Sequence, residues 1–266
     1  MVKNLSDKPT RLFCSNCRMH VHSKIIKVPT FVGSVIYEYY CPNCGKLLKK
    51  EEKPFQLPDR ENIIKKSKIG IYIAFEGING AGKTYYSQKL ARYLNERGYS
   101  VVYVREPWIK AIKEFLYKHD LDPDVETYIF AADRIILQKE IILTALAQGK
   151  IVISDRSIYS SLAYQGARGL NLEFIWAINR SIRLPDLVIL LDIPVNEALK
   201  RLRRISRKLT KFEEPKYLDK VRRIFLDLAK TVKYSSFVII DVQKEENEVF
   251  REIIDHVEKF IKKRWG

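Results

Sequence analysis

A glycine-rich segment that follows a short apolar run constrains the fold more than any other part of the sequence. The apolar run is IGIYIAF and the chain continues EGINGAGKT, so that four residues separate Gly77 from Gly82, and Lys83 and Thr84 follow. Between an expected strand and an expected helix, this is the spacing of a phosphate-binding loop. In such a loop, main-chain N–H groups converge on phosphate oxygens at the start of the helix. The segment predicts a P-loop domain that binds a nucleoside triphosphate.

Contacts to ATP and its Mg²⁺ are expected along this loop and at one strand end. The predicted ATP contacts are Gly77, Ile78, Asn79, Gly80, Ala81, Gly82, Lys83 and Thr84. Lys83 is expected to reach the outer phosphates, and Thr84 to coordinate Mg²⁺. Asp155 ends the run IVIS at the carboxyl edge of the expected sheet, where it is predicted to orient Mg²⁺ through water. Capping of the following loop is an alternative role for Asp155.

The rest of the chain after residue 68 alternates apolar runs with helical patterns. Strands are expected at 69–75, 101–104, 151–154, 187–192 and 237–241. Such βαβ alternation predicts an α/β fold with a five-stranded parallel sheet covered by helices on both faces. Gly98 is expected to end the first helix, while Asp122 and Pro123 open a long helix that Gly149 closes. Residues 68–266 therefore form the predicted P-loop domain.

All four cysteines lie in the first 44 residues, as the pairs Cys14/Cys17 and Cys41/Cys44. Two CxxC pairs at this separation predict a structural zinc site, with a β-hairpin between them, in a small β zinc ribbon over residues 1–45. Two disulfides are the alternative. The histidines His20 and His22 are expected at the hairpin surface rather than as ligands. The charged segment 46–67 is predicted to be a linker.

Composition and charge indicate which partners and which cellular compartment to expect. The net charge of +16 favours polyanionic partners, although a Lys/Glu-rich surface is also typical of heat-adapted proteins. With 46% hydrophobic and 30% charged residues, disorder is excluded. The polar N-terminus and the absence of an uninterrupted apolar stretch of about 18 residues lead us to expect a soluble, cytoplasmic protein without membrane contact.

Five stretches together resemble thymidylate kinases and occur in the same order along the chain. They are FEGINGAGKT, REP at 105–107, YIFAADR at 128–134, DRSIYSSLAYQGARGL at 155–170 and PDLVILLDIPVNEALKR at 185–201. The resemblance implies a nucleoside monophosphate kinase that transfers the γ-phosphoryl group of ATP to dTMP with Mg²⁺. It also implies a homodimer.

The resemblance assigns roles at the acceptor site. Phe130 would stack on thymine, Arg134 would bond a base carbonyl, and Tyr164 would exclude a ribose 2′-hydroxyl. The predicted substrate-binding set is Asn79, Arg105, Phe130, Arg134, Arg156, Ser161, Tyr164 and Gln165. Read without the family, the alternative for Phe130 is a core residue of an amphipathic helix.

Catalysis is expected to rest on cations, because phosphoryl transfer spreads negative charge over oxygens and one arginine can contribute about 10³–10⁵ in rate. Gly80 stands where some members carry an arginine, so the basic lid segment 200–214 would supply the guanidinium. The predicted catalytic residues are Lys83, Arg156, Arg203, Arg204 and Arg207. A solvated helix face or a nucleic-acid patch is the alternative for the lid.

The sequence departs from the family pattern at several positions. Asn79 replaces an aspartate, Trp108 follows REP where a glycine pair is usual, Ser157 replaces an aromatic residue, and Lys211 replaces a lid arginine. These departures leave two competing functions open. One is a kinase for another nucleoside monophosphate or a nucleoside, and the other is a nucleic-acid-binding P-loop ATPase that uses the zinc ribbon. Contact of the ribbon with nucleic acid or protein is likewise open.

Overall fold

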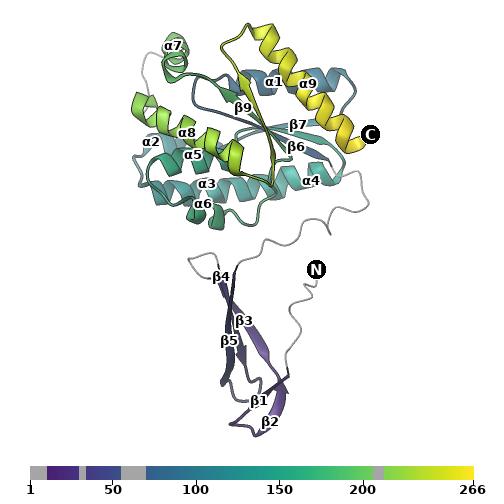
Figure 1. Cartoon of the computed structure of the whole chain (residues 1–266), viewed down its shortest axis with the longest axis vertical. Coiled ribbons are helices and arrows are strands. Elements are labelled where there is room, and N and C mark those ends of the chain that lie inside the picture. Colours follow the sequence, from purple (N-terminus) through teal and green to yellow (C-terminus); the bar gives the residue numbers. More distant parts are fainter. Residues whose placement is uncertain (1–10, 30–33, 55–69, 206–212) are drawn as a thin grey trace. The chain divides into compact units, whose positions relative to one another are not determined.

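The computed structural model describes residues 11–29, 34–54, 70–205 and 213–266 and divides the chain into two compact units. The first unit spans residues 1–65 and the second spans residues 66–266. Figure 1 shows strands in the first unit and a helix-covered sheet in the second.

The first unit contains two small antiparallel sheets. Strand β1 (Arg11–Cys14) pairs with β2 (Met19–His22), and β4 (Ser34–Tyr40) lies between β3 (Lys24–Pro29) and β5 (Leu47–Pro54). The hairpin expected between the cysteine pairs is present as β3 and β4, while residues 30–33 lie outside the described part of the chain. This arrangement fits the predicted zinc ribbon.

Strand β5 overturns part of the predicted linker. Residues 47–54 pair with β4 instead of forming a loose connection, and residues 55–67 lie outside the described part of the chain. The register places Lys50 opposite Glu38 and Lys49 opposite Tyr39. Lys50 and Glu38 form an ion pair at 3.1 Å. Charge pairs with the neighbouring strand stabilise β5. Its sequence therefore lacks the alternation of apolar and polar residues by which strands are predicted.

The second unit is built on a parallel sheet of five strands, as predicted. The strands are β6 (Ile71–Glu76), β7 (Val101–Arg105), β8 (Ile151–Asp155), β9 (Leu187–Asp192) and β10 (Ser236–Asp241). They pair in the order β10-β9-β6-β8-β7, every pair parallel. The first strand of this unit, β6, is therefore central, and the loops after β6 and β8 meet at one edge of the sheet.

Helices cover both faces of this sheet, because side chains that alternate along β6 and β8 are buried on both sides. Ile71 and Ile73 belong to one apolar cluster, while Tyr72 and Val152 belong to another. Figure 1 shows α1 (Lys83–Glu96) and α9 (Glu246–Trp265) on one face, and α3 (Pro123–Leu137), α4 (Leu143–Ala147), α5 (Ile158–Ala167) and α8 (Pro215–Thr231) on the other. The remaining helices are α2 (Lys110–Lys118), α6 (Leu172–Ile178) and α7 (Val195–Ile205).

The long helix expected between residues 123 and 149 is interrupted. A π-helical segment, Gln138–Ile142, separates α3 from α4, and Gly149 follows in a left-handed conformation at φ 72°. The first helix behaves as expected, since α1 ends at Glu96 and Gly98 has φ 86°. The sequence thus located both helix ends but not the widened turn between them.

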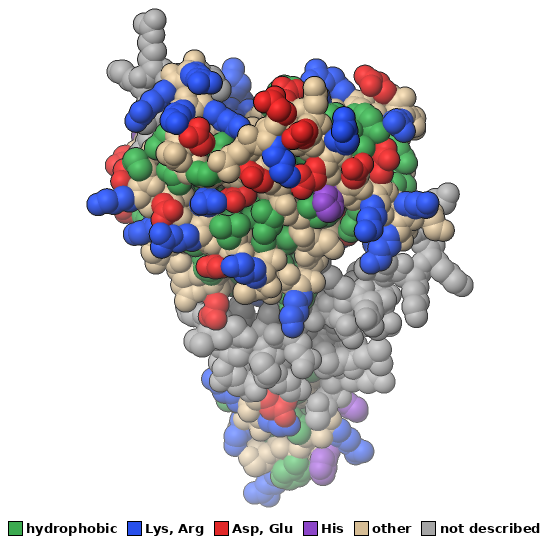
Figure 2. Space-filling view, turned by 45° about the horizontal axis from the view of Figure 1, so that its top comes forward, with side chains coloured by type: hydrophobic (Ala, Val, Ile, Leu, Met, Phe, Trp, Pro, Cys, Tyr) green, Lys and Arg blue, Asp and Glu red, His purple; other side chains and the backbone are tan. Residues whose placement is uncertain are grey.

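The surface of the second unit carries both signs of charge. Figure 2 shows Lys and Arg side chains interspersed with Asp and Glu over the face in view. No helix in the described ranges is both long enough and apolar enough to cross a bilayer.

Candidate functional site

The loop between β6 and α1 is packed tightly against the backbone of two neighbouring elements, β9 and α7. Gly77 has φ 138°, and a Cβ atom there would lie 2.4 Å from the carbonyl oxygen of Leu191. Gly80 has φ 88°, and its Cβ atom would lie 2.6 Å from the carbonyl oxygen of Ala198. A side chain at either position would require both a strained backbone and a displaced neighbour. These two glycines hold the loop against β9 and α7.

Lys83, the first residue of α1, folds over this loop. Its side chain is only 6% exposed, and Nζ donates hydrogen bonds of 2.9 Å to the carbonyl oxygens of Gly77 and Ile78. Burial, reinforced by the positive charge of Arg156, lowers the pKa of Lys83. The hydrogen bonds to the loop hold the ammonium group beside the N-terminus of α1. An anion is favoured there, because the helix N-terminus and the loop amides are also partly positive.

Thr84 and Asp155 come together beside Lys83 from different elements. Thr84 Oγ1 donates a short hydrogen bond to Asp155 Oδ2, and Arg105 Nε lies 3.3 Å from the same oxygen. Asp155 is 1% exposed, and its Oδ1 atom has no hydrogen-bond partner among the described residues. A hydroxyl and a carboxylate with an unsatisfied oxygen form the donor set that Mg²⁺ prefers. These residues fit the metal predicted to accompany ATP.

Asn79 and Arg156 form the boundary between the loop and α5. Asn79 Oδ1 accepts hydrogen bonds from Arg156 Nη2 at 2.7 Å and from the Tyr164 hydroxyl at 2.9 Å. The Arg156 guanidinium also lies over the Tyr164 ring, 5.1 Å from its centroid. Arg156 has φ 81°, which is uncommon for a residue other than glycine. Backbone strain is therefore concentrated at the residue expected to grip the acceptor phosphate.

Glu76 lies beneath this boundary and is a site residue that the sequence analysis missed. Its carboxylate accepts bonds from the Ser157 amide at 2.8 Å, the Ser157 hydroxyl at 2.7 Å and the Ser160 hydroxyl at 2.6 Å. Burial raises the pKa of Glu76, while the serine hydroxyls oppose that rise. Ser157, which departs from the family pattern, thus joins the end of β6 to the start of α5. A charged residue at the end of an otherwise apolar strand was the available signal.

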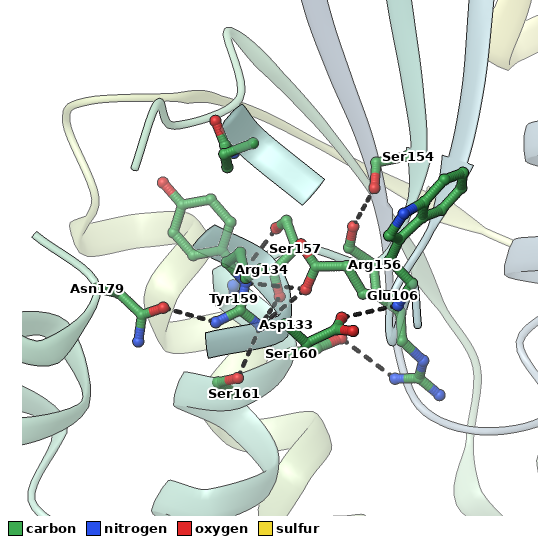
Figure 3. A network of polar contacts seen from close by, with 12 residues as sticks. Glu106, Asp133, Arg134, Ser154, Arg156, Ser157, Tyr159, Ser160, Ser161 and Asn179 are labelled. Atoms are coloured by element: carbon green, nitrogen blue, oxygen red, sulfur yellow. Dashed lines mark hydrogen bonds and ion pairs between the residues drawn. The ribbon is translucent and has the colours of Figure 1, made fainter. Parts of the chain in front are cut away.

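Arg134 is buried and held from several directions, as Figure 3 shows. Its Nε donates to Glu106 at 2.9 Å, Nη1 to Asn179 at 2.7 Å, and Nη2 to the Ser161 hydroxyl at 2.9 Å. Because these bonds fix the guanidinium plane, a ligand meets Arg134 in one orientation. Glu106 and Asn179 were not predicted as site residues, since their role depends on contacts between distant parts of the sequence.

Asp133 explains another departure from the family pattern. It is buried, and its two carboxylate oxygens accept the main-chain N–H groups of Trp108 at 2.7 Å and Ile109 at 2.8 Å. The loop after β7 is thereby anchored to α3 through its backbone. Because the contact uses main-chain atoms, it does not require the glycine pair that is usual after REP.

Two cavities meet at this site. One brings together seven of the predicted substrate-binding residues: Asn79, Phe130, Arg134, Arg156, Ser161, Tyr164 and Gln165. The other is lined by loop residues together with Arg105, Asp155, Arg201, Arg204 and Lys244. Asn79, Tyr117 and Arg156 line both cavities. The site therefore has room for two anionic ligands that touch a common wall.

Not every predicted residue lies where the sequence placed it. Arg105 lines the cavity of the phosphate loop rather than the cavity that contains Phe130. Arg204 lines the phosphate-loop cavity, whereas Arg203 is exposed and lines neither cavity. Arg207 and Lys211 lie outside the described residues. Arg201, which was not among the predicted catalytic residues, lines the phosphate-loop cavity and donates to the carbonyl oxygen of Val242 at 2.6 Å.

The four cysteines of the first unit form a separate cluster. All four Sγ atoms lie within 4.8 Å of one another, with Cys14 and Cys44 3.6 Å apart and Cys17 and Cys41 3.8 Å apart. These distances exceed the length of about 2.05 Å of a disulfide, and all four thiols are free. A tetrahedral centre with Zn–S bonds of about 2.3 Å separates its sulfurs by roughly 3.8 Å. The cluster thus matches a four-thiolate metal site and not the alternative of two disulfides.

Comparison with known proteins shows which family the chain with these two cavities belongs to. The model of the family described as thymidylate kinase matches residues 75–253. The chain belongs to the thymidylate kinase family. A protein named "Probable thymidylate kinase" from Methanosphaera stadtmanae is 40% identical over 200 residues, which cover 72% of this chain and 100% of the relative. A protein of the same name from Thermococcus gammatolerans is 38% identical over 207 residues, covering 73% and 98%.

Membership in this family makes the chain a nucleoside monophosphate kinase, as the five sequence stretches implied. The thymidylate kinase match covers both cavities and does not include the four cysteines. It does not favour the alternative of a nucleic-acid-binding ATPase. The first unit is thus an addition to the thymidylate kinase part of this chain.

Proposed function

We propose that the protein transfers the γ-phosphoryl group of ATP to dTMP, forming dTDP and ADP. The observation that carries this proposal is the pair of cavities that share Asn79, Tyr117 and Arg156. A phosphate-binding loop occupies one side of that wall, and a ring and a fixed guanidinium, Phe130 and Arg134, occupy the other. Donor and acceptor phosphates held there would be neighbours, which is the geometry that in-line transfer requires.

On the donor side, the loop amides and Lys83 bind the outer phosphates of ATP. Thr84 and Asp155 would hold Mg²⁺, which when bound offsets the negative charge of the phosphates. Arg204 adds a cation to the lining of this cavity, and Arg207 is proposed to act with it from the lid. Because these groups act by position and charge, no protein nucleophile is needed.

On the acceptor side, Arg156 binds the monophosphate while Phe130 stacks against the thymine. Phe130 is half-buried in the cavity wall, so one part of its ring remains available to a ligand. Arg134 donates to a base carbonyl from its fixed position. Ser161 and Gln165 line the same cavity, and Tyr164, whose ring lies under the Arg156 guanidinium, is proposed to exclude a ribose 2′-hydroxyl.

The experiment that tests this function compares acceptors. ADP release would be followed with dTMP, dUMP, dCMP, UMP and thymidine under the same ATP and Mg²⁺ concentrations. We expect the highest kcat/KM with dTMP and the lowest with thymidine, because thymidine has no phosphate for Arg156. A clear preference for an acceptor without thymine would overturn the proposal.

We also propose that the four cysteines hold Zn²⁺ and that the chain works in the reducing environment of the cytoplasm. The sulfur separations support the metal site, and the free thiols support the compartment. The main-chain N–H of Cys17 contributes most to lowering the pKa of Cys14 to about 7, which favours the thiolate that zinc needs. The ribbon would fold as a metal-stabilised unit of its own, ahead of the kinase domain at 68–266.

A homodimer is proposed from the surface of α3 and α6. Val125, Tyr128 and Leu172 are exposed apolar side chains on or beside these helices. Tyr128 also contacts Phe174, with ring centroids 5.5 Å apart. Apolar side chains gathered on neighbouring helices favour burial against a second copy. Light scattering coupled to gel filtration would report twice the mass of one chain.

A further inference from the structure

One face of the small β1–β2 sheet has no part in the kinase reaction and no role in the core of its own unit. It consists of Arg11, Phe13, His20 and His22, which we call the β1–β2 face. The antiparallel register places Arg11 opposite His22 and Phe13 opposite His20, so that all four side chains lie on one side of the sheet. All four are exposed. The other side of the sheet contributes Cys14 and Val21 to the core.

The aromatic residue of this face is exposed to an unusual degree. Phe13 is 56% exposed, and its ring contacts the His20 ring in an edge arrangement with centroids 5.3 Å apart. The buried apolar cluster around the cysteines is small, with Cys14, Val21 and Cys41 as its buried members among the described residues. A benzyl side chain that stabilised the fold would be buried there. Its position on the outer side instead points to a partner.

The charges around the β1–β2 face are positive. Glu38 and Glu51 are the acids on this part of the unit whose side chains the structure describes, and each is paired with a lysine, Lys50 and Lys49 respectively. Arg11, Arg18 and Lys24 are exposed and form no ion pair with a described acid. The face therefore offers one accessible ring on the same side of the sheet as the guanidinium of Arg11, with Arg18 between β1 and β2 and Lys24 at the start of β3 as further exposed cations.

We propose that the β1–β2 face binds single-stranded nucleic acid, with a base stacked on Phe13 and phosphates bound by Arg11 and its basic neighbours. Stacking on an exposed aromatic ring beside cations that follow the backbone is the physical basis of binding to single strands. A duplex hides the faces of its bases, so it cannot use the ring. The inference does not depend on the choice of acceptor in the kinase reaction.

The same features argue against a protein partner. Standard protein interfaces involve about 20–30 residues on each side and a core depleted of charge. The β1–β2 face presents four side chains, one of them a guanidinium and two of them imidazoles. A polyanion with flat bases matches this set better than an apolar protein surface does.

The experiment uses the full-length, zinc-loaded protein and a fluorescent, mixed-sequence DNA strand of about 15 nucleotides, with dTMP and ATP present to occupy the kinase site. Anisotropy is measured at low and moderate salt, and a duplex of the same length is compared. We expect Phe13→Leu to weaken binding about 10-fold and Phe13→Trp to retain it, since a base stacks on an aromatic ring but not on a leucine side chain. Arg11→Ala is expected to weaken binding and to reduce its salt dependence by about one phosphate contact.

The matched control is Phe115→Leu. Phe115 is also an exposed phenylalanine beside a histidine, since its ring lies 4.5 Å from that of His119, but it is on α2 in the other unit. We expect this variant to bind the strand as the unchanged protein does. Zinc content and dTMP turnover, measured on every variant, show whether each is folded.

Three results would overturn the proposal. The first is no binding of the strand at low salt by the zinc-loaded protein. The second is equal binding by Phe13→Leu and the unchanged protein, or equal losses in Phe13→Leu and Phe115→Leu. The third is concentration-dependent association of the chain with itself that Phe13→Leu abolishes, which would assign the face to a second copy.

Discussion

Asn79 Oδ1 accepts a hydrogen bond of 2.7 Å from Arg156 Nη2, which fixes the orientation of the amide. Arginine only donates, so the oxygen must face it, and the hydroxyl of Tyr164 takes the second acceptor position at 2.9 Å. The Nδ2 group forms no bond with a described residue and belongs to a side chain that lines both cavities. Where the family pattern has a second carboxylate oxygen, this chain therefore presents N–H donors.

Asn79→Asp tests the consequence of that difference. The aspartate would keep the bonds to Arg156 and Tyr164 and add a negative charge beside the phosphates. We expect KM for dTMP to rise by about 3- to 10-fold and the Mg²⁺ concentration for half-maximal rate to fall, because like charges repel and a carboxylate attracts the cation. Initial rates over a matrix of dTMP and Mg²⁺ concentrations measure both.

Asn79→Ala serves as the control for this test. It removes the bonds to Arg156 and Tyr164 without adding charge, so its KM for dTMP should rise while its Mg²⁺ requirement stays the same. If the aspartate variant also left the Mg²⁺ requirement unchanged, the charge argument would fail.

Phe130→Ala tests the acceptor pocket. Loss of the ring should weaken dTMP binding by about 1–3 kcal/mol, the range for stacking on one base, and leave ATP binding nearly intact. Calorimetric titration with each nucleotide separately measures the two affinities. Phe130→Tyr is the matched variant and should retain most of the dTMP affinity. Equal losses for dTMP and ATP would indicate a general loss of structure instead.

The pH dependence of ATP binding follows from Lys83. Burial, with Arg156 close by, lowers its pKa below the ordinary value of 10.5, and bound phosphates should raise it again. Between the lowered and the ordinary pKa, ATP binding is therefore expected to take up a proton, and its affinity to fall as pH rises. Calorimetry at about pH 8.5 in two buffers of different ionisation enthalpy counts that proton.

Lys83→Met should abolish the proton uptake along with most of the ATP affinity. If the unchanged protein gave the same heat in both buffers, Lys83 would already be charged in the free loop.

Zinc content provides the fourth test. Metal analysis of the purified protein should find about one zinc per chain, and Cys14→Ser should reduce it, because a tetrahedral site with one ligand lost binds more weakly. The dTMP turnover of Cys14→Ser is expected to stay within about 2-fold of the unchanged protein, since the family match excludes the cysteines. A metal-free protein with paired disulfides would contradict the thiolate cluster.

The central strands β6, β8 and β9 could be predicted within two residues because they are buried on both faces. Runs such as Leu187–Asp192 must be continuously apolar and so stand out in the sequence. Strand β5 does not, because it is held by pairs such as Lys50 with Glu38 and carries few apolar residues. Predicting β5 would have required knowing that β4 lies beside it.

The site residues likewise divide into those that a local sequence pattern predicts and those that depend on contacts between distant parts of the chain. The phosphate loop is local, so its spacing alone located Lys83 and Thr84. Glu76, in contrast, acts through Ser160, which is 84 residues away in the chain, and no local pattern reports that contact. The same limit explains Arg105, whose place beside Asp155 is set by the pairing of β7 with β8.

The wall formed by Asn79, Tyr117 and Arg156 has a further consequence for inhibition. Because these three residues line both cavities, one compound that joins thymidine to adenosine through a chain of phosphates should fill both at once. Its second half would bind at a high effective concentration after the first has docked. Tethered compounds of this kind are thus a rational starting point for tight, selective ligands of this enzyme.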